Sequence, residues 1–209
     1  LIDVACDPDL VQIAIKASGL PVCVCSVEPD LFIPAVKAGA SMIEIGNFDS
    51  FYPQGRFFSA SEVLDLAIQT RSLLPNIVLS VTVPHFLPLD QQAQLALDLV
   101  ESGADLIQTE GGTSARPHSP GILGLIEKAA PTLAATHAIH STLVENECLV
   151  PVISASGLSA ITLPMAFSIG AAGVGVGSVV NRLSDEVAMI AVVRSLRQAL
   201  LPTYPLASI

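Results

Sequence analysis

A short pattern that decides the fold occurs three times in the chain: AGASMIEIG at residues 38–46, SGADLIQTEG at 102–111 and IGAAGVGVG at 169–177. In each copy a Gly-Ala pair ends a segment with helical periodicity, and a short apolar run that finishes in glycine follows. Strands buried on both faces and alternating with helices are typical of parallel sheets. This repeated helix–glycine–strand unit therefore predicts a (β/α)8 TIM barrel.

Seven strands and seven helices follow from the same alternation. The predicted strands are 2–6, 22–26, 42–46, 77–83, 105–109, 152–155 and 173–177, and the predicted helices are 9–17, 30–38, 61–74, 90–102, 120–144, 160–169 and 185–200. Seven strands are one fewer than a closed barrel needs, so we expect a single barrel domain over 1–209 whose first β-strand is missing from this sequence. The alternative is an open doubly wound sheet, which would normally begin with a glycine-rich turn that is not found here. Residues 202–209 are expected to form an irregular tail.

The composition excludes several functions. Hydrophobic residues make up 51% of the 209 residues and charged residues 13%, and the net charge of −10 disfavours binding to nucleic acid or to an anionic membrane. Residues 148–181 carry no charge, but their prolines, serines and glycines argue against a membrane span. The four cysteines contain no CxxC pair, which predicts free thiols in a reducing, cytoplasmic compartment and no metal cluster.

Carboxylates at strand ends are the candidate catalytic groups, because barrel active sites lie at the carboxyl ends of the strands. Glu44, Glu110 and Asp3 each interrupt an apolar run, where burial would raise the pKa and suit a general acid or base. The alternative for each is a structural hydrogen bond within the sheet. His85 follows a predicted strand and is either an acid–base partner or simply a solvated loop residue. His137 and His140 share a helix face without a metal-binding pattern, so no metal site is predicted.

A phosphate site is predicted where the last two strands end. Ser156 and Gly157 follow one strand, while Gly175, Gly177 and Ser178 follow the next. Glycines let backbone amides face an anion, and a short helix from residue 178 would add its positive end. The alternative is that these glycines serve only close packing of strands against helices.

Two further features bear on function. The three lysines, Lys16, Lys37 and Lys128, all fall on predicted helices, so a Schiff-base mechanism is disfavoured. Residues 47–58 contain five of the nine aromatic residues and follow the third predicted strand. This segment is either a lid or partner surface, or a small hydrophobic cluster beneath a loop.

The motifs 44–49 (EIGNFD), 83–85 (VPH), 108–111 (QTEG) and 156–158 (SGL) together resemble one family. It is the conserved chloroplast reading-frame 23 family, also called domain of unknown function 561, found in cyanobacteria and algal plastids. The resemblance covers nearly the whole chain and implies a phosphate-binding, TIM-barrel-like protein in the cyanobacterial cytosol or plastid stroma. It also implies a further βα unit before the first strand, and it implies no particular reaction.

These observations favour an enzyme that acts on a small phosphorylated metabolite by acid–base chemistry, as in an isomerase, lyase or synthase. One alternative is a barrel that binds flavin mononucleotide (FMN) at the same phosphate site. Another is a non-catalytic photosynthetic accessory or regulatory protein. The charge-poor surface also predicts a homodimer, since few charges are available to cover the apolar helix faces.

Overall fold

The computed structural model describes residues 1–200, in which seven strands pair in sequence order and every neighbouring pair is parallel. The strands are β1 (Ile2–Ala5), β2 (Val22–Ser26), β3 (Met42–Ile45), β4 (Val78–Val83), β5 (Leu106–Thr109), β6 (Val152–Ala155) and β7 (Gly173–Gly175). All seven predicted strands are confirmed, and β7 ends two residues earlier than predicted. The predicted tail at residues 202–209 lies outside the described residues.

The helices connect successive strands. They are α1 (Pro8–Ser18), α2 (Pro29–Lys37), α3 (Ala60–Leu73), α4 (Leu89–Glu101), α5 (Gly121–Glu145), α6 (Leu163–Ser168), α7 (Ser178–Asn181) and α8 (Glu186–Gln198), with short 3-10 turns η1 (Phe48–Ser50) and η2 (Tyr52–Gln54). The seven predicted helices are present. However, α6 begins at Leu163 rather than at residue 160, because Ser159 and Thr162 bond to each other in a turn that precedes it.

Helix starts follow local capping rules. Asp7 caps α1 and Asp185 caps α8 by accepting hydrogen bonds from backbone amides of the first turn. Ser59 and Glu62 form a reciprocal capping box at the start of α3, as their spacing predicts. These caps fix where each helix leaves its preceding loop.

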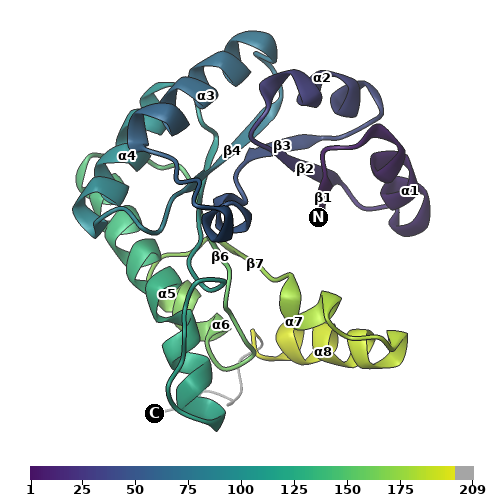
Figure 1. Ribbon diagram of the computed structural model, residues 1–209, viewed down its shortest axis with the longest axis vertical. Helices are drawn as coiled ribbons and strands as arrows, with labels where there is room; N and C mark the ends of the chain where they lie inside the picture. Colours follow the sequence, from purple (N-terminus) through teal and green to yellow (C-terminus); the bar gives the residue numbers. More distant parts are fainter. Residues whose placement is uncertain (201–209) are drawn as a thin grey trace, which may run out of the picture.

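The apolar core lies between the outer face of the sheet and the helices. Val24, Ile43, Val81 and Ile107 point outward and pack against helix residues such as Phe32, forming one cluster. Figure 1 shows the helices in an arc around this outer side, with α1 and α8 at its two ends. Consecutive helices from α1 to α6 contact one another, which is the arrangement of a barrel rather than of a doubly wound sheet.

The inner face of the sheet is polar by contrast. Side chains alternate between faces along a strand, and the register places Asp3 beside Cys23, Cys25 beside Glu44, and Thr82 beside Gln108. None of these positions belongs to the apolar cluster, so the inner face is available for chemistry.

Closure of the barrel is the point where expectation and structure differ. Within residues 1–200, β1 pairs only with β2 and β7 only with β6, so the sheet is a curled half-barrel of seven strands with two edges. The fold is therefore an α/β fold with a curled parallel sheet, and a complete (β/α)8 barrel is not formed by the described part of the chain. Among the same residues, no helix is both long and apolar enough to cross a membrane.

Candidate functional site

Glu44 occupies the centre of the polar inner face. It comes from β3, is 5% exposed, and accepts hydrogen bonds from the Thr82 hydroxyl at 2.8 Å and the Gln108 amide at 2.6 Å. Burial raises the pKa of Glu44 to about 7, with a further upward contribution from the charge of Asp3, while the bonds from Thr82 and Gln108 act in the opposite direction. Glu44 is thus a carboxyl group that can both accept and donate a proton near neutral pH.

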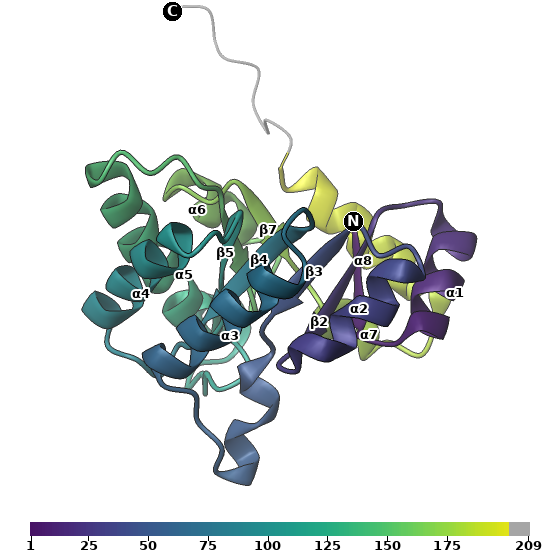
Figure 2. The same cartoon turned by 90° about the horizontal axis from the view of Figure 1, so that it is seen from above.

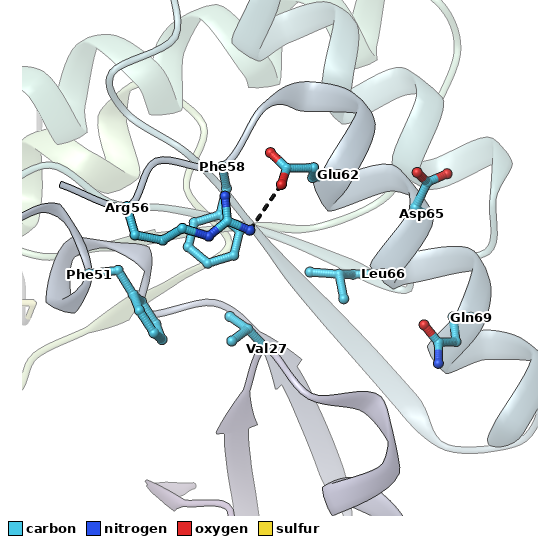
Figure 3. A pocket seen from close by; sticks show the side chains of 8 residues that line it. All are labelled: Val27, Phe51, Arg56, Phe58, Glu62, Asp65, Leu66 and Gln69. Atoms are coloured by element: carbon cyan, nitrogen blue, oxygen red, sulfur yellow. Dashed lines mark hydrogen bonds and ion pairs between the residues drawn. The ribbon is translucent and has the colours of Figure 1, made fainter. Parts of the chain in front are cut away.

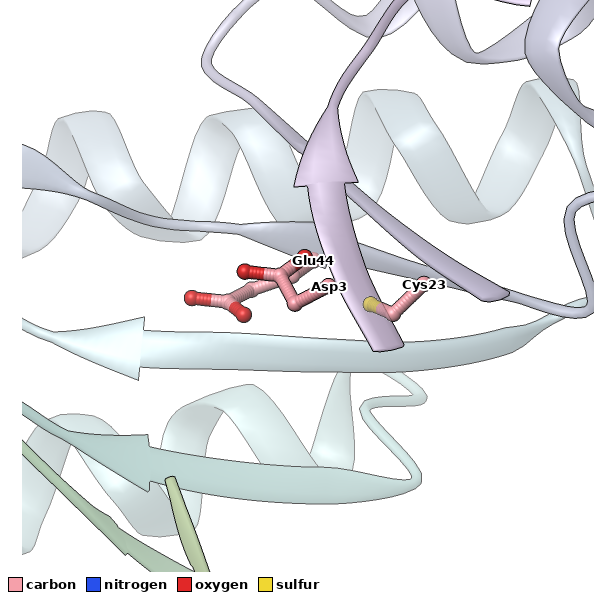
Figure 4. A group of neighbouring side chains, drawn as sticks. All are labelled: Asp3, Cys23 and Glu44. Atoms are coloured by element: carbon pink, nitrogen blue, oxygen red, sulfur yellow. The ribbon is translucent and has the colours of Figure 1, made fainter. Parts of the chain in front are cut away.

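Asp3 and Cys23 lie next to Glu44 (Figure 4), and the carboxyl groups of Asp3 on β1 and Glu44 on β3, with β2 between them, point to the same side. Asp3 belongs to the edge strand β1 and retains contact with solvent, yet desolvation by the surrounding sheet raises the pKa of its carboxyl group to about 6. Burial likewise raises the pKa of the Cys23 and Cys25 thiols far above the usual range. All four cysteines are free, as predicted, and these two remain protonated.

A second polar cluster lies where β3, β4 and β5 end. Glu110 follows β5 and accepts hydrogen bonds from the Tyr52 hydroxyl at 2.5 Å, from the backbone amide of His85 at 3.2 Å and from that of Asp49 at 3.2 Å. The Nδ1 atom of His85 lies 3.2 Å from Glu110 Oε1 and 3.3 Å from Asp49 Oδ1. Sequence reasoning identified Glu110 and His85, and the structure brings them into direct contact.

The charges in this second cluster are strongly coupled. Burial alone would lower the pKa of His85, but the hydrogen bonds and charges of Asp49 and Glu110 outweigh it and raise that pKa to about 9. Burial raises the pKa of Glu110. Burial also acts to raise the pKa of Asp49, but the proximity of His85, together with other nearby polar groups, brings it below its usual value. His85 is therefore a mostly covered side chain held between two carboxyl groups rather than a solvated loop histidine.

Sequence reasoning missed Asp49 and Tyr52 as site residues. Both lie in the aromatic segment 47–58, which carries η1 and η2 and projects beyond the sheet in Figure 2. The sequence signal that could have identified them is the position of this segment directly after β3, since the carboxyl end of β3 lies at the same edge of the sheet as His85 and Glu110.

The aromatic segment forms the small hydrophobic cluster that its composition suggests and also leaves aromatic rings exposed. Phe48 and Phe58 are buried and pack against each other with ring centroids 4.7 Å apart, so they form the small hydrophobic cluster. Tyr52, Phe57 and Phe86 instead stack beside His85, and Phe57 and Phe86 are largely exposed. One half of the segment is therefore core, and the other half borders the second polar cluster.

The predicted phosphate-site residues lie on adjacent loops, because β6 and β7 pair through Ala155 and Gly175. The backbone amides of Gly157, Gly177 and Ser178 donate no hydrogen bond within residues 1–200. Ser156 has a φ of 77°, a strained conformation for a non-glycine residue, and its hydroxyl accepts from the Thr113 amide at 3.1 Å.

The glycines of these loops differ in role. A Cβ on Gly157 would lie 2.7 Å from the Cα of Gly112, so this position is required for close backbone packing. A Cβ on Gly175 would lie 3.0 Å from that of Ala155, whereas one on Gly177 would meet no atom within 4 Å. Close packing therefore accounts for Gly157 but not for Gly177. The predicted short helix is present as α7, but its single turn is too short for a substantial dipole.

A pocket of about 330 Å³ lies between the aromatic segment and α3, away from both polar clusters and from the loops after β6 and β7. Figure 3 shows it beside α3, where Arg56 stacks on Phe58 at 4.1 Å and pairs with Glu62 at 2.9 Å. None of the predicted site residues lines it. Lys16, Lys37 and Lys128 lie on α1, α2 and α5, as predicted, so none extends from a strand.

Structures of known proteins share this fold at low sequence identity. The structure of 2,3-dimethylmalate lyase, from the PEP mutase/isocitrate lyase superfamily, matches with a TM-score of 0.63 and 12% identity over 94% of this chain and 69% of that one. A 3-hexulose-6-phosphate synthase matches with a TM-score of 0.58 and 18% identity over 93% and 81% of the two chains. At such identities the likeness establishes a TIM-barrel-like fold.

Sequence relatives are much closer. The ycf23 protein of Cyanophora paradoxa is 45% identical over 90% of this chain and 76% of its own length. The ycf23 protein of Porphyra purpurea is 37% identical over 95% of this chain and 73% of its own length. The family model described as "Protein of unknown function (DUF561)" matches residues 1–204. The chain therefore belongs to the DUF561 family, together with the plastid-encoded ycf23 proteins.

Proposed function

We propose that this protein is an enzyme of the cyanobacterial cytosol or plastid stroma that acts on a small phosphorylated metabolite by acid–base chemistry. The observation that carries the proposal is Glu44, a buried carboxyl group on the inner face of a parallel sheet whose pKa is raised to about 7. A general acid or base works best when its pKa lies near the working pH. Burying such a group without a function would only destabilise the fold.

Glu44 and Glu110 transfer protons in this proposal, assisted by His85 and by Asp3. Thr82 and Gln108 fix the Glu44 carboxyl group, while Asp3 disfavours its ionised form. The three lysines are all on helices, so the reaction proceeds without an imine to lysine. Isomerase, lyase and synthase reactions meet these requirements.

The phosphate group of the metabolite is assigned to the loops after β6 and β7. Backbone amides of Gly157, Gly177 and Ser178 that have no partner within residues 1–200 support this assignment, together with the hydroxyl groups of Ser156 and Ser178 and the open space at Gly177. Gly175 allows the β7 strand to approach Ala155 at the base of the site. Thiamine phosphate pyrophosphorylase and 3-hexulose-6-phosphate synthase, which share the fold, are named for phosphorylated compounds.

The proposal also concerns the architecture of the complete protein. We propose that the complete protein is a single (β/α)8 barrel in which the strands described here are the second to the eighth. The two unpaired edges of the sheet, β1 and β7, support this, since an additional parallel strand between them would close the barrel. The curated relatives are longer than the matched region, which leaves room for such a unit.

A thermal-shift screen of phosphorylated metabolites, followed by turnover assays of each ligand, tests the proposal. At ten times its Kd a ligand stabilises the protein by about 1.4 kcal/mol, or roughly 3–6 °C for a chain of this size. We expect a stabilising metabolite to be turned over by the wild type and not by Glu44→Gln. Equal turnover by both would refute the acid–base role. A yellow protein that holds FMN would favour the flavin alternative, and unchanged cellular phenotypes for Glu44→Gln and Glu110→Gln would favour an accessory protein.

A further inference from the structure

The second polar cluster has the composition and geometry of a metal site. Asp49, His85 and Glu110 each offer one ligand atom, and these atoms lie within 4.8 Å of one another. Nδ1 of His85 is 3.3 Å from Asp49 Oδ1 and 3.2 Å from Glu110 Oε1. Ligand atoms at bond lengths of about 2.0 Å in a tetrahedral zinc site lie about 3.3 Å apart, so both separations from His85 Nδ1 fit such a site.

Asp49 gives an independent reason to expect a ligand. Its side chain is 7% exposed, and its Oδ1 atom has no hydrogen-bond partner in the described part of the chain, although it points at the His85 ring. A buried carboxylate oxygen without a partner is costly, because burial removes its hydration. A cation bound by Oδ1 would supply the missing interaction.

The charge of the cluster leads to the same conclusion. The trio brings two carboxyl groups and one imidazole together, and no lysine or arginine in residues 1–200 forms an ion pair with any of them. A divalent cation with a neutral imidazole would make the cluster neutral. The buried charges would then be compensated within the site.

The surroundings of Glu110 are those of an oriented metal ligand. The Tyr52 hydroxyl and the His85 amide hold its Oε1 atom, and the Asp49 amide holds Oε2. Outer hydrogen bonds of this kind fix the direction of ligating carboxylates. Three protein ligands also leave a position for water or substrate, as in catalytic zinc sites.

We propose that Asp49, His85 and Glu110 bind one divalent transition-metal cation, with zinc as the best match to one nitrogen and two carboxylate oxygens. The metal proposal changes the reaction proposed above, because it uses Glu110 and His85 as ligands. With the cation bound, proton transfer is left to Glu44 and Asp3, which lie outside the trio. The other group with suitable ligand types, Asp3, Cys23 and Glu44, contains a thiol whose pKa is raised well above the usual range and is the poorer site.

Isothermal titration of chelator-treated protein with zinc sulfate, and separately with manganese chloride, tests the proposal. We expect one zinc per chain in the wild type and a loss of affinity of more than tenfold in Asp49→Asn and in Glu110→Gln. Tyr52→Phe should lose about tenfold, since it removes only an orienting bond. Cys23→Ser is the matched control for the thiol-containing group and should bind as the wild type does.

Two results would overturn the proposal. One is the absence of zinc and manganese binding at millimolar concentrations by folded wild-type protein, which would make the trio an ion-pair cluster only. The other is equal binding by the wild type and by Asp49→Asn, which would place the cation elsewhere. Gly177→Asp separates this proposal from the metabolite proposal, because it should abolish phosphate binding and leave zinc binding unchanged.

Discussion

Replacing Glu44 with glutamine should make the protein more stable at neutral and alkaline pH. The pKa of this buried carboxyl group is raised from 4.5 to about 7, so between these values the folded protein holds a proton that the unfolded chain releases. The free energy of unfolding therefore falls as the pH rises through this window. A shift of this size corresponds to about 3 kcal/mol when the group is fully ionised, because each pKa unit is worth about 1.4 kcal/mol.

Urea unfolding of wild type and Glu44→Gln between pH 5.5 and pH 8.5 measures this effect. The advantage of the variant should grow by about 2 kcal/mol over this range, since roughly 1.5 of the 2.5 units of the shift lie within it. Glutamine keeps an oxygen that can accept from Thr82 and Gln108, so the packing changes little. Glu101→Gln, at an exposed position at the end of α4, is the control and should follow the wild type. Parallel stability curves for wild type and Glu44→Gln would show that Glu44 ionises normally and would remove the main support for its catalytic role.

Three further predictions concern stability and assembly. Ser59→Ala should lower the free energy of unfolding by about 1 kcal/mol, because it removes the capping box of α3; an unchanged urea midpoint would contradict this. Gly112→Ala should destabilise the protein by more than about 2 kcal/mol, because its Cβ would lie against the backbone of Gly157. Gly55→Ala should cost less, because its Cβ would meet no atom within 4 Å and only the φ of 76° disfavours alanine there. Light scattering should give twice the chain mass of 21.7 kDa, since α8 leaves Val187 and Ile190 exposed, and a monomer mass would exclude the homodimer.

The elements of the fold were predictable because their signals are local. Glycine after α1, α2, α4 and α6, apolar runs for each strand and side-chain caps such as Ser59 depend only on neighbouring residues. Barrel closure depends instead on whether β1 and β7 pair with a further strand. The residues of β1 and β7 alone carry no signal for such pairing. The repeated unit therefore predicted the parallel order correctly, whereas the closed (β/α)8 barrel that it also predicted is not formed by residues 1–200.

The candidate site was predictable in part for a similar reason. Glu44, His85 and Glu110 could be identified because a polar residue at the end of an apolar strand stands out. Asp49 and Tyr52 could not, since their importance arises only when the segment after β3 folds back to His85 and Glu110. An aromatic-rich loop indicates packing and carries no signal for the hydrogen bond that Tyr52 makes.

The binding of phosphate at the loops after β6 and β7 is the most direct test of the central claim. Nuclear magnetic resonance of ¹⁵N-labelled protein titrated with inorganic phosphate reports on each backbone amide. We predict saturable changes in the amide chemical shifts of Gly157, Gly177 and Ser178. These changes should be lost in Gly177→Asp, because a carboxylate would occupy the anion position. They should be retained in Lys37→Ala, a control at an exposed position of α2. Absence of shifts at these amides up to millimolar phosphate, or identical shifts in Gly177→Asp, would contradict the account.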